Sequence, residues 1–200
     1  MDAKTQKAEL TRAAIVGAAL DLAAAEGLEA ISLQVVADRV GLSKSGVFSR
    51  VGSREALQLA VVEEFGRRFI AEVFVPAKTC PKGLPRLDSI VQRWIVRTRD
   101  VEAQQGCIYT AGAFELDDKD GPLRDFLHGE VTRWRAALRR TVLQAIECGH
   151  LKADTDAEQL VSELYALNIG LLHDVRFLRD ARAPERSLAT WARLLQTYQP

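Results

Sequence analysis

The stretch from residue 32 to residue 57 constrains the fold more than any other part of the chain. It carries start and stop signals for two short helices joined by a tight turn. Ser32 and Ser43 are good N-caps, since a serine hydroxyl can accept a hydrogen bond from a free backbone N–H of the first helical turn. Gly41 comes after the first helix, where a left-handed C-cap conformation favours glycine. The apolar residues that follow these caps at helical spacing are Val36, Ala37, Val40, Val47 and Val51.

This arrangement predicts a helix-turn-helix, a unit whose second helix fits the major groove of DNA. Four basic side chains lie in it, and no acidic residue stands between the first and the last of them: Arg39, Lys44, Arg50 and Arg54. A helix-turn-helix without that charge could serve packing alone. With it, contact to DNA phosphates is the favoured interpretation.

Motifs on both sides of this unit extend the pattern. An E-G-L turn at residues 26–28 ends a helix expected over residues 10–26. V-A-D-R-V-G-L-S follows at residues 36–43, then V-F-S-R-V at 47–51 and G-S-R-E-A-L at 52–57. Together these motifs make the first 75 or so residues resemble the DNA-binding domain of the tetracycline-repressor (TetR) family of bacterial transcriptional regulators.

The resemblance implies that the start of the second short helix enters the major groove. Lys44 can donate there to guanine O6 or N7, and Gln34 on the first helix can pair with adenine. Two positions depart from the family pattern: Phe48 lacks the hydroxyl of the usual tyrosine, and Arg50 replaces the usual histidine and is always charged. Phe48 is then either a core residue or an apolar contact to a thymine methyl. Phosphates better suit Ser32, Ser49, Arg50 and Arg54. The candidate DNA-binding residues are Ser32, Gln34, Ser43, Lys44, Ser45, Gly46, Phe48, Ser49, Arg50 and Arg54.

Bulk composition gives this interpretation no support, because 27 basic and 27 acidic side chains balance. No apolar run is long enough to span a bilayer, and the polar N-terminus is unlike a signal peptide, so a cytoplasmic protein without a membrane partner is expected. The cysteines Cys80, Cys107 and Cys148 are odd in number and lack metal-ligand spacing. Free thiols are the plain interpretation, and a redox-sensing cysteine is the alternative.

Neither a cofactor nor an enzymatic activity is expected. The acidic loop at residues 115–120 could hold a hard cation, but such loops are more often solvated turns, so no metal is predicted. His128, His150 and His173 could in principle form a Cys–His pair with a cysteine, but no sequence signature supports one.

Apolar residues at helical spacing continue to the C-terminus, and no segment alternates with period two, so the chain is predicted to be all-α. We expect a helix-turn-helix DNA-binding domain over residues 1–52, a connecting helix over 53–75, and a larger helical effector-binding and dimerisation domain over 76–200. Three prolines and a glycine at residues 76–85 end the connector. In the second domain, residues 106–127 (GCIYTAGAFELDDKDGPLRDFL) are similar to a stretch common in one group of these regulators.

Aromatic and polar residues of the second domain fall on helices whose apolar faces should converge. Each one alone is most simply a core residue. Taken together, and with the resemblance, they imply a small molecule bound between helices. The candidate ligand-binding residues are Trp94, Tyr109, Phe114, Trp134, Asn168 and His173.

The helix expected around residues 157–180 is apolar on two sides. One side carries Leu160, Leu164, Leu167, Leu171 and Leu178, and beside it lie Val161, Tyr165, Asn168, Leu172 and Val175. One side can pack on the protein's own core and the other on a second copy across a two-fold axis. The sequence therefore predicts a homodimeric, ligand-responsive regulator, most simply a repressor that a small molecule releases from a palindromic operator by changing the spacing of its recognition helices. The alternatives are activation in place of repression, and a helical scaffold that uses the motif for protein contacts.

Overall fold

The computed structural model describes residues 2–200, which are mostly helical and contain no strand. This confirms the predicted all-α class. Contacts divide the chain into two compact units. The N-terminal unit comprises the chain up to Arg67 together with Ile108–Gly129, and the C-terminal unit comprises Arg68–Cys107 and Glu130–Pro200. The functional boundaries expected after residues 52 and 75 remain predictions. The two units defined by contacts differ from them because residues 108–129 pack with the N-terminal helices.

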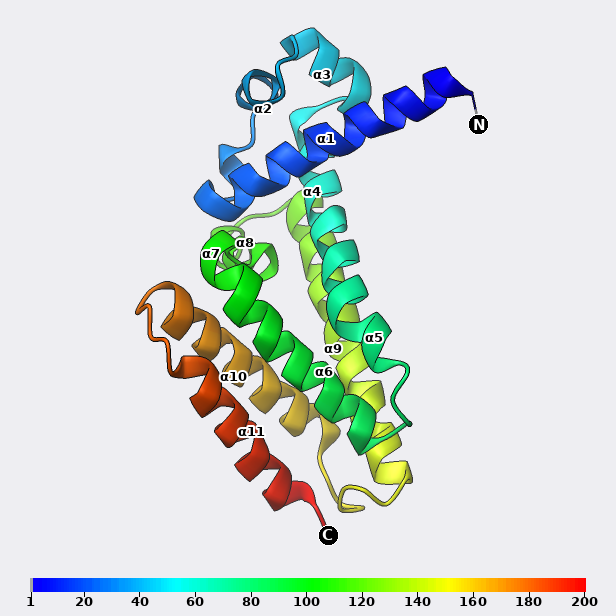
Figure 1. The fold of residues 1–200 in the computed structure, drawn as a ribbon, viewed down its shortest axis with the longest axis vertical. Coiled ribbons are helices and arrows are strands. Elements are labelled where there is room, and N and C mark those ends of the chain that lie inside the picture. The colour runs from blue at the N-terminus through cyan, green and yellow to red at the C-terminus, as the bar shows by residue number, and fades with distance from the viewer. Residues whose placement is uncertain (1) are drawn as a thin grey trace. The chain divides into compact units, whose positions relative to one another are not determined.

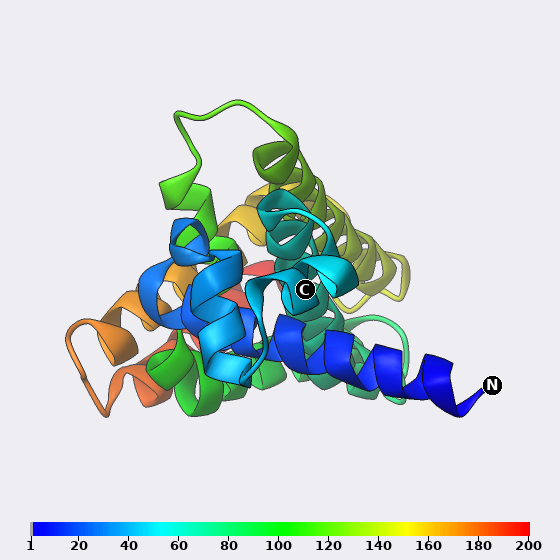
Figure 2. The same ribbon diagram turned by 90° about the horizontal axis from the view of Figure 1, so that it is seen from above.

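The N-terminal unit opens with α1 (Ala3–Glu26), the 3-10 turn η1 (Leu28–Ala30), α2 (Leu33–Val40) and α3 (Lys44–Val51). α1 starts earlier than its apolar stripe predicts, because alanine, lysine, glutamine and glutamate favour helix without a buried face. Both α2 and α3 pack against α1, as Figure 2 shows from above. The core side chains of this unit with at most 1% exposure include Ile15, Leu22, Leu28, Ile31, Val36, Val47 and Leu57.

The caps of the helix-turn-helix have the geometry that the sequence predicts. Ser32 and Ser43 each accept a hydrogen bond, through Oγ, from the backbone N–H three residues ahead, at 3.1 Å in both cases. Gly41 has φ = 67°, in the left-handed region, and the N–H that follows it closes the turn on α2. Glycine reaches this conformation without steric cost, so the chain can turn sharply from α2 into α3.

The rest of the N-terminal unit comes from α4 (Arg54–Phe69) up to Arg67, α8 (Ile108–Glu115) and the start of α9 (Pro122–Glu147). α8 approaches the core closely at Gly112. A Cβ atom there would lie 2.9 Å from Leu28 Cδ1 and 3.0 Å from a methyl of Leu127. A residue without a side chain is therefore what lets α8 pack onto the segment that follows α1.

The C-terminal unit is built from helices that run alongside one another. Figure 1 shows α10 and α11 side by side with α6 next to them, and all three pairs are in contact. Hydrogen bonds tie α11 to the other two: Trp191 Nε1 donates to Asp88 Oδ1 at 2.8 Å, and Tyr198 OH to Glu163 Oε2 at 2.8 Å. Besides the rest of α9, the elements are η2 (Ile70–Phe74), α5 (Val75–Ala77), α6 (Leu84–Arg97), η3 (Thr98–Glu102), α7 (Ala103–Gln105), α10 (Ala157–Arg176) and α11 (Ala183–Tyr198).

Two segments of this unit, η2 and η3, are π-helical. Apolar residues at helical spacing predict ordinary α-helix there. A π-helical turn is rare, inserts extra backbone into a helix, and is found frequently at functional sites. None of the helices in the described part of the chain is both long and apolar enough to cross a membrane.

Candidate functional site

α3 contributes little of its surface to the core of the N-terminal unit. Val47 is its one fully buried residue. The exposed residues of the helix are Lys44, Ser45, Phe48, Ser49 and Arg50. A helix anchored by so few side chains leaves most of its circumference available to a partner, as a recognition helix requires.

The cations on α3 are free. Among residues 2–200, Lys44 and Arg50 make no hydrogen bond or ion pair, whereas Arg39 on α2 pairs with Glu26 at 3.3 Å. Lys44 also lies at the N-terminal end of α3, where unpaired backbone N–H groups carry partial positive charge. An unpaired cation beside a helix N-terminus, such as Lys44, favours contact with phosphate, and Arg50 adds a second unpaired cation in the last turn of the helix.

Several other predicted contact residues are engaged within their own helices. Ser49 Oγ donates to the carbonyl of Gly46 at 2.8 Å, Gln34 Nε2 donates to Asp38 Oδ1 at 2.8 Å, and Ser43 serves as a cap. Phe48 is 58% exposed, so it is not a core residue. Its contact with a thymine methyl and the base contact of Gln34 stay predictions.

Arg54, for which the sequence predicts a phosphate contact, binds backbone carbonyl groups of its own unit. Its Nε donates to the carbonyl of Ile31 at 2.7 Å and its Nη2 to the carbonyl of Glu29 at 2.6 Å. Both acceptors lie in the segment between α1 and α2. A phosphate contact by the remaining N–H groups of Arg54 stays a prediction.

The interior of the C-terminal unit contains a cluster of aromatic rings. Trp94 and Trp134 are 6% and 4% exposed and meet edge to face, with ring centroids 5.5 Å apart. Phe69 packs on Trp134 at 4.9 Å, and Tyr165 packs on Trp94 at 5.3 Å. The indole N–H of Trp134 is buried and has no hydrogen-bond acceptor among the described residues. A buried donor without an acceptor is rare in folded proteins.

Polar groups lie next to these rings, around the π-helical segment η3. Arg97 Nε is 3.2 Å from Glu102 Oε1, and Thr98 Oγ1 is 3.2 Å from Glu102 Oε2 and 3.1 Å from Asn168 Oδ1. Arg97 also pairs with Glu72 of η2. Except for Glu72, each of these residues is at most 6% exposed.

Burial raises the pKa of Glu102 above its ordinary value, and the opposing influence of Arg97 only partly offsets it. Hydrogen bonds from Thr98 and Cys107 also favour the charged carboxylate, less strongly than burial disfavours it. The single hydroxyl proton of Thr98 can serve either Glu102 or Asn168. A protonated Glu102 could donate to Thr98, which would then donate to Asn168, so both protonation states can be accommodated.

The C-terminal half matches the model of a protein family. Residues 83–191, more than half of the chain, match the family described as tetracyclin repressor-like, C-terminal domain. The chain belongs to the tetracycline-repressor family. It is thus a ligand-responsive, DNA-binding transcriptional regulator, and the comparisons give no support to a helical scaffold.

Solved structures of TetR-family regulators share the fold of this TetR-family protein. One from Cytophaga hutchinsonii is 17% identical with a TM-score of 0.83, covering 96% of each chain. One from Chloroflexus aurantiacus is 23% identical with a TM-score of 0.80, covering 96% of this chain and 98% of that one. A structure described as the molecular basis for control of antibiotic production by bacterial hormones is 26% identical, with a TM-score of 0.68 and coverage of 98% and 96%. No curated protein sequence matches the chain.

The structure of this TetR-family protein brings together three of the six predicted effector residues. Trp94, Trp134 and Asn168 lie in the interior of the C-terminal unit. His173 is exposed and sits 3.2 Å from Asp174. Tyr109 and Phe114 belong to the N-terminal unit, where Tyr109 packs on the ring of Phe65 at 4.9 Å and Phe114 is 68% exposed.

Sequence reasoning missed Arg97 and Glu102 as interior groups and did not count Tyr165 among the effector residues. Arg97 and Glu102 are five residues apart, a spacing that an α-helix does not bring together and a π-helical turn does. Glu102 therefore looked like an ordinary surface carboxylate. Tyr165 could have been found, because it lies one helical turn before Asn168 on the same apolar side.

We expect the stability of this TetR-family protein to depend on pH through Glu102. Folding raises the pKa of Glu102, so the folded state binds the proton of this carboxyl more tightly than the unfolded state does. The stability that Glu102 contributes in this way is fully present below the ordinary carboxyl pKa of 4.5 and is lost as pH rises through the raised pKa. The free energy of unfolding of the wild type should therefore fall relative to that of Glu102→Gln as pH rises from about 4 to about 8. Urea denaturation of both proteins across this range measures the difference, and a difference that stays constant or changes in the opposite direction contradicts the account.

Proposed function

We propose that this protein is a cytoplasmic homodimeric repressor that holds a palindromic operator through α3 and leaves it when a small molecule binds inside its C-terminal unit. The exposed and unpaired state of Lys44 and Arg50 on α3 is the observation that carries the DNA-binding part. Because the whole chain has no net charge, attraction to DNA has to come from such local cations.

Replacement of the two α3 cations should separate base recognition from phosphate contact. Lys44→Ala should weaken operator binding by about 1–3 kcal/mol and relax the preference at one base step, since its amine would read guanine. Arg50→Ala should weaken binding to all duplexes alike and reduce the slope of log K against log salt by roughly one. Fluorescence anisotropy on a duplex selected from a random pool by the wild-type protein, titrated with salt, measures both effects.

Arg193→Ala is the matched control, because it removes an exposed arginine from α11 in the C-terminal unit. Its affinity and salt slope should equal those of the wild type. Unchanged binding by both α3 variants would mean that another surface contacts DNA.

The chemistry of the interior supports an uncharged effector. Arg97, which lies over the ring of Phe69, is paired with Glu72 and Glu102, so it offers an ionised molecule no free counter-charge. Arg135, over the ring of Tyr165, is outside this pairing, so an anionic compound would have to bind there and away from the indole of Trp134. The aromatic rings offer an apolar wall, and the indole N–H of Trp134 lacks an acceptor. An uncharged molecule with a ring or chain and one carbonyl or hydroxyl oxygen suits this combination.

Trp134→Phe tests this proposal, because it removes the N–H and keeps an aromatic ring. A panel of neutral carbonyl and hydroxyl compounds is first assayed for release of the wild-type protein from DNA. The active compound should release Trp134→Phe only at about tenfold higher concentration, the loss expected for one hydrogen bond. Binding of the variant to DNA without the compound should not change.

Trp191→Phe is the control, since its N–H already donates to Asp88 and it lies in the same unit. It should respond to the compound like the wild type. An equal response of Trp134→Phe, or release of DNA by charged compounds alone, would contradict an uncharged effector bound at this indole.

The exposed apolar residues of α10 and α11 support the homodimer. Leu160, Leu164 and Leu171 are at most 2% exposed in the single chain. Val161 and Leu172 of the neighbouring side are at most 8% exposed, so both sides that the sequence singled out pack on the chain's own core, and the division between core and dimer predicted for them is wrong. Other apolar residues on or just beyond the two helices are 39% to 76% exposed: Ile169, Phe177, Leu178 and Leu188. Two adjacent helices with apolar residues at the surface can form a four-helix bundle with a second copy. A two-fold dimer would place its recognition helices roughly 34–36 Å apart, one DNA turn.

Charge placed on this surface should give a folded monomer. The double variant Ile169→Asp with Leu188→Asp alters exposed positions only, so helicity should persist while dimerisation and operator affinity are lost. Sedimentation velocity at micromolar concentration measures the association state. Val96→Asp, at an exposed apolar position of α6, should remain a dimer. A wild-type protein that sediments as a folded monomer would refute the dimer.

A further inference from the structure

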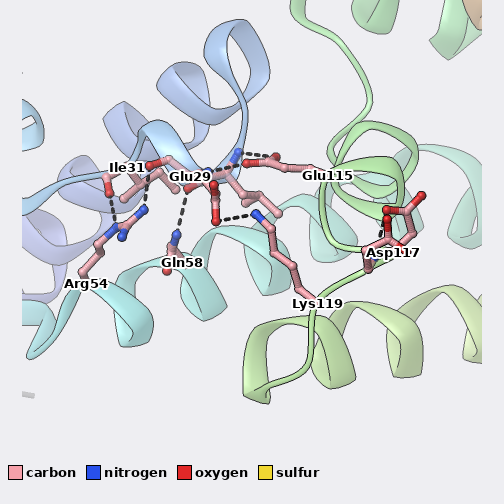
Figure 3. A network of polar contacts seen from close by, with 9 residues as sticks. Glu29, Ile31, Arg54, Gln58, Glu115, Asp117 and Lys119 are labelled. Atoms are coloured by element: carbon pink, nitrogen blue, oxygen red, sulfur yellow. Dashed lines mark hydrogen bonds and ion pairs between the residues drawn. The ribbon is translucent and has the colours of Figure 1, made fainter.

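The segment between α1 and α2 is held from outside by side chains that come later in the sequence. It contains the 3-10 turn Leu28–Ala30 and the buried residue Ile31, and α2 starts directly after it. Figure 3 shows these side chains around the turn. They come from two places, α4 and the end of α8 with the loop behind it. The position of α2, and of α3 after it, therefore depends on contacts that are distant in sequence.

The side chains from α4 bind carbonyl groups of the turn. Arg54 donates to the carbonyls of Glu29 and Ile31 at 2.6 and 2.7 Å, and Gln58 Nε2 donates to the carbonyl of Leu28 at 2.9 Å. Arg54 and Gln58 are one helical turn apart, so the same face of α4 supplies both. Without these donors, each of the three carbonyl groups would need another hydrogen-bond partner at the edge of the core.

The side chain from α8 binds the opposite set of backbone groups. Glu115 Oε2 accepts from Leu28 N at 2.8 Å, and Glu115 Oε1 accepts from Glu29 N at 2.6 Å. One carboxylate thus takes both free N–H groups at the start of the turn through short, charge-assisted hydrogen bonds. Lys119 in the loop after α8 adds an ion pair with Glu29 at 2.6 Å, which is solvent-exposed and therefore weak.

Backbone geometry at Gly27 is suited to this contact. Gly27 has φ = 94°, and a Cβ atom placed on it would lie 3.0 Å from Glu115 Oε2. A side chain there would meet both backbone strain and the carboxylate. Together with the close packing of Gly112 on Leu28, this shows a built contact in which two glycines give α8 and its carboxylate access to the turn.

We propose that Glu115 is a positioning residue for DNA recognition, which holds the turn after α1, and through it α2 and α3, in the form that binds DNA. The proposal rests on the DNA-binding role of α3. Glu115 itself need not touch DNA. Loss of the carboxylate leaves the two N–H groups without partners, loosens the turn and lets the recognition helix leave its binding position.

Glu115→Gln provides the first test, because it keeps the size of the side chain and one acceptor but removes the charge. On the duplex selected by the wild-type protein, its affinity should fall about tenfold. The slope of log K against log salt should be unchanged, because no phosphate contact is removed. Glu115→Asp keeps the charge but is one methylene too short to span both N–H groups. Its affinity for the duplex should lie between that of the wild type and that of Glu115→Gln, and it provides the same test if Glu115→Gln does not fold.

Two controls separate positioning from a general loss of stability. Asp117→Asn removes an exposed carboxylate of the same loop, which accepts a hydrogen bond from the N–H of the neighbouring Asp118, and should bind like the wild type. Val16→Ala removes buried methyl groups from α1 and lowers stability by core truncation. At a temperature where all variants are fully folded, Val16→Ala should bind DNA within about twofold of the wild type.

The outcomes are distinct. Equal affinity of Glu115→Gln and the wild type, or a loss no larger than that of Val16→Ala, overturns the positioning role and leaves the proposed function standing. A changed salt slope also overturns it, because Glu115 would then alter the phosphate contacts themselves. Failure of the wild-type protein to select any duplex overturns the DNA-binding function, and the positioning role with it.

Discussion

The two hydrogen bonds from the N–H groups of Leu28 and Glu29 to the Glu115 carboxylate are the contact on which the DNA-binding unit most depends. Backbone donors at a folded turn need partners, and among residues 2–200 the structure gives neither of these N–H groups a backbone acceptor. Serine caps and a left-handed glycine hold α2 and α3 to each other. α2 and α3 also pack directly on α1, and the turn through which the chain enters α2 is held by a residue more than eighty positions away in the sequence.

Covalent continuity links this contact to the interior of the C-terminal unit. Cys107, whose thiol hydrogen-bonds to Glu102, is followed at once by α8, and α8 ends at Glu115. Further along, α9 carries Trp134. A buried ion pair such as Arg97–Glu102 contributes little net stability, because desolvation offsets its attraction. The proposed effector would bind beside this cluster, because Arg97 lies over the ring of Phe69, which packs on Trp134.

Local signals were sufficient to predict the helix-turn-helix, because Ser32, Gly41 and Ser43 act within a few residues of themselves. Helix order and the all-α class also followed from apolar spacing. The Glu115 contact, and the backbone contacts of Arg54, could not be predicted, because they join side chains to backbone groups far apart in sequence and leave no periodic pattern. The Arg97–Glu102 pair could not be predicted either, because a π-helical turn at Thr98–Glu102 brings together two residues that an α-helix would keep apart. Of the six expected effector residues, Trp94, Trp134 and Asn168 lie in the interior of the C-terminal unit, because an apolar helix face predicts burial. Tyr109 and Phe114 lie on α8, and apolar spacing does not show which of the two units a helix joins.

Amide hydrogen exchange of the wild-type protein tests the central claim most directly, because it reports on the two N–H groups themselves. If the Glu115 carboxylate holds the turn in the folded protein, the amides of Leu28 and Glu29 should exchange as slowly as those in the middle of α1, with an opening free energy close to that of global unfolding. Exchange of these two amides at the rate of an unstructured peptide, while α1 stays protected, would contradict the account.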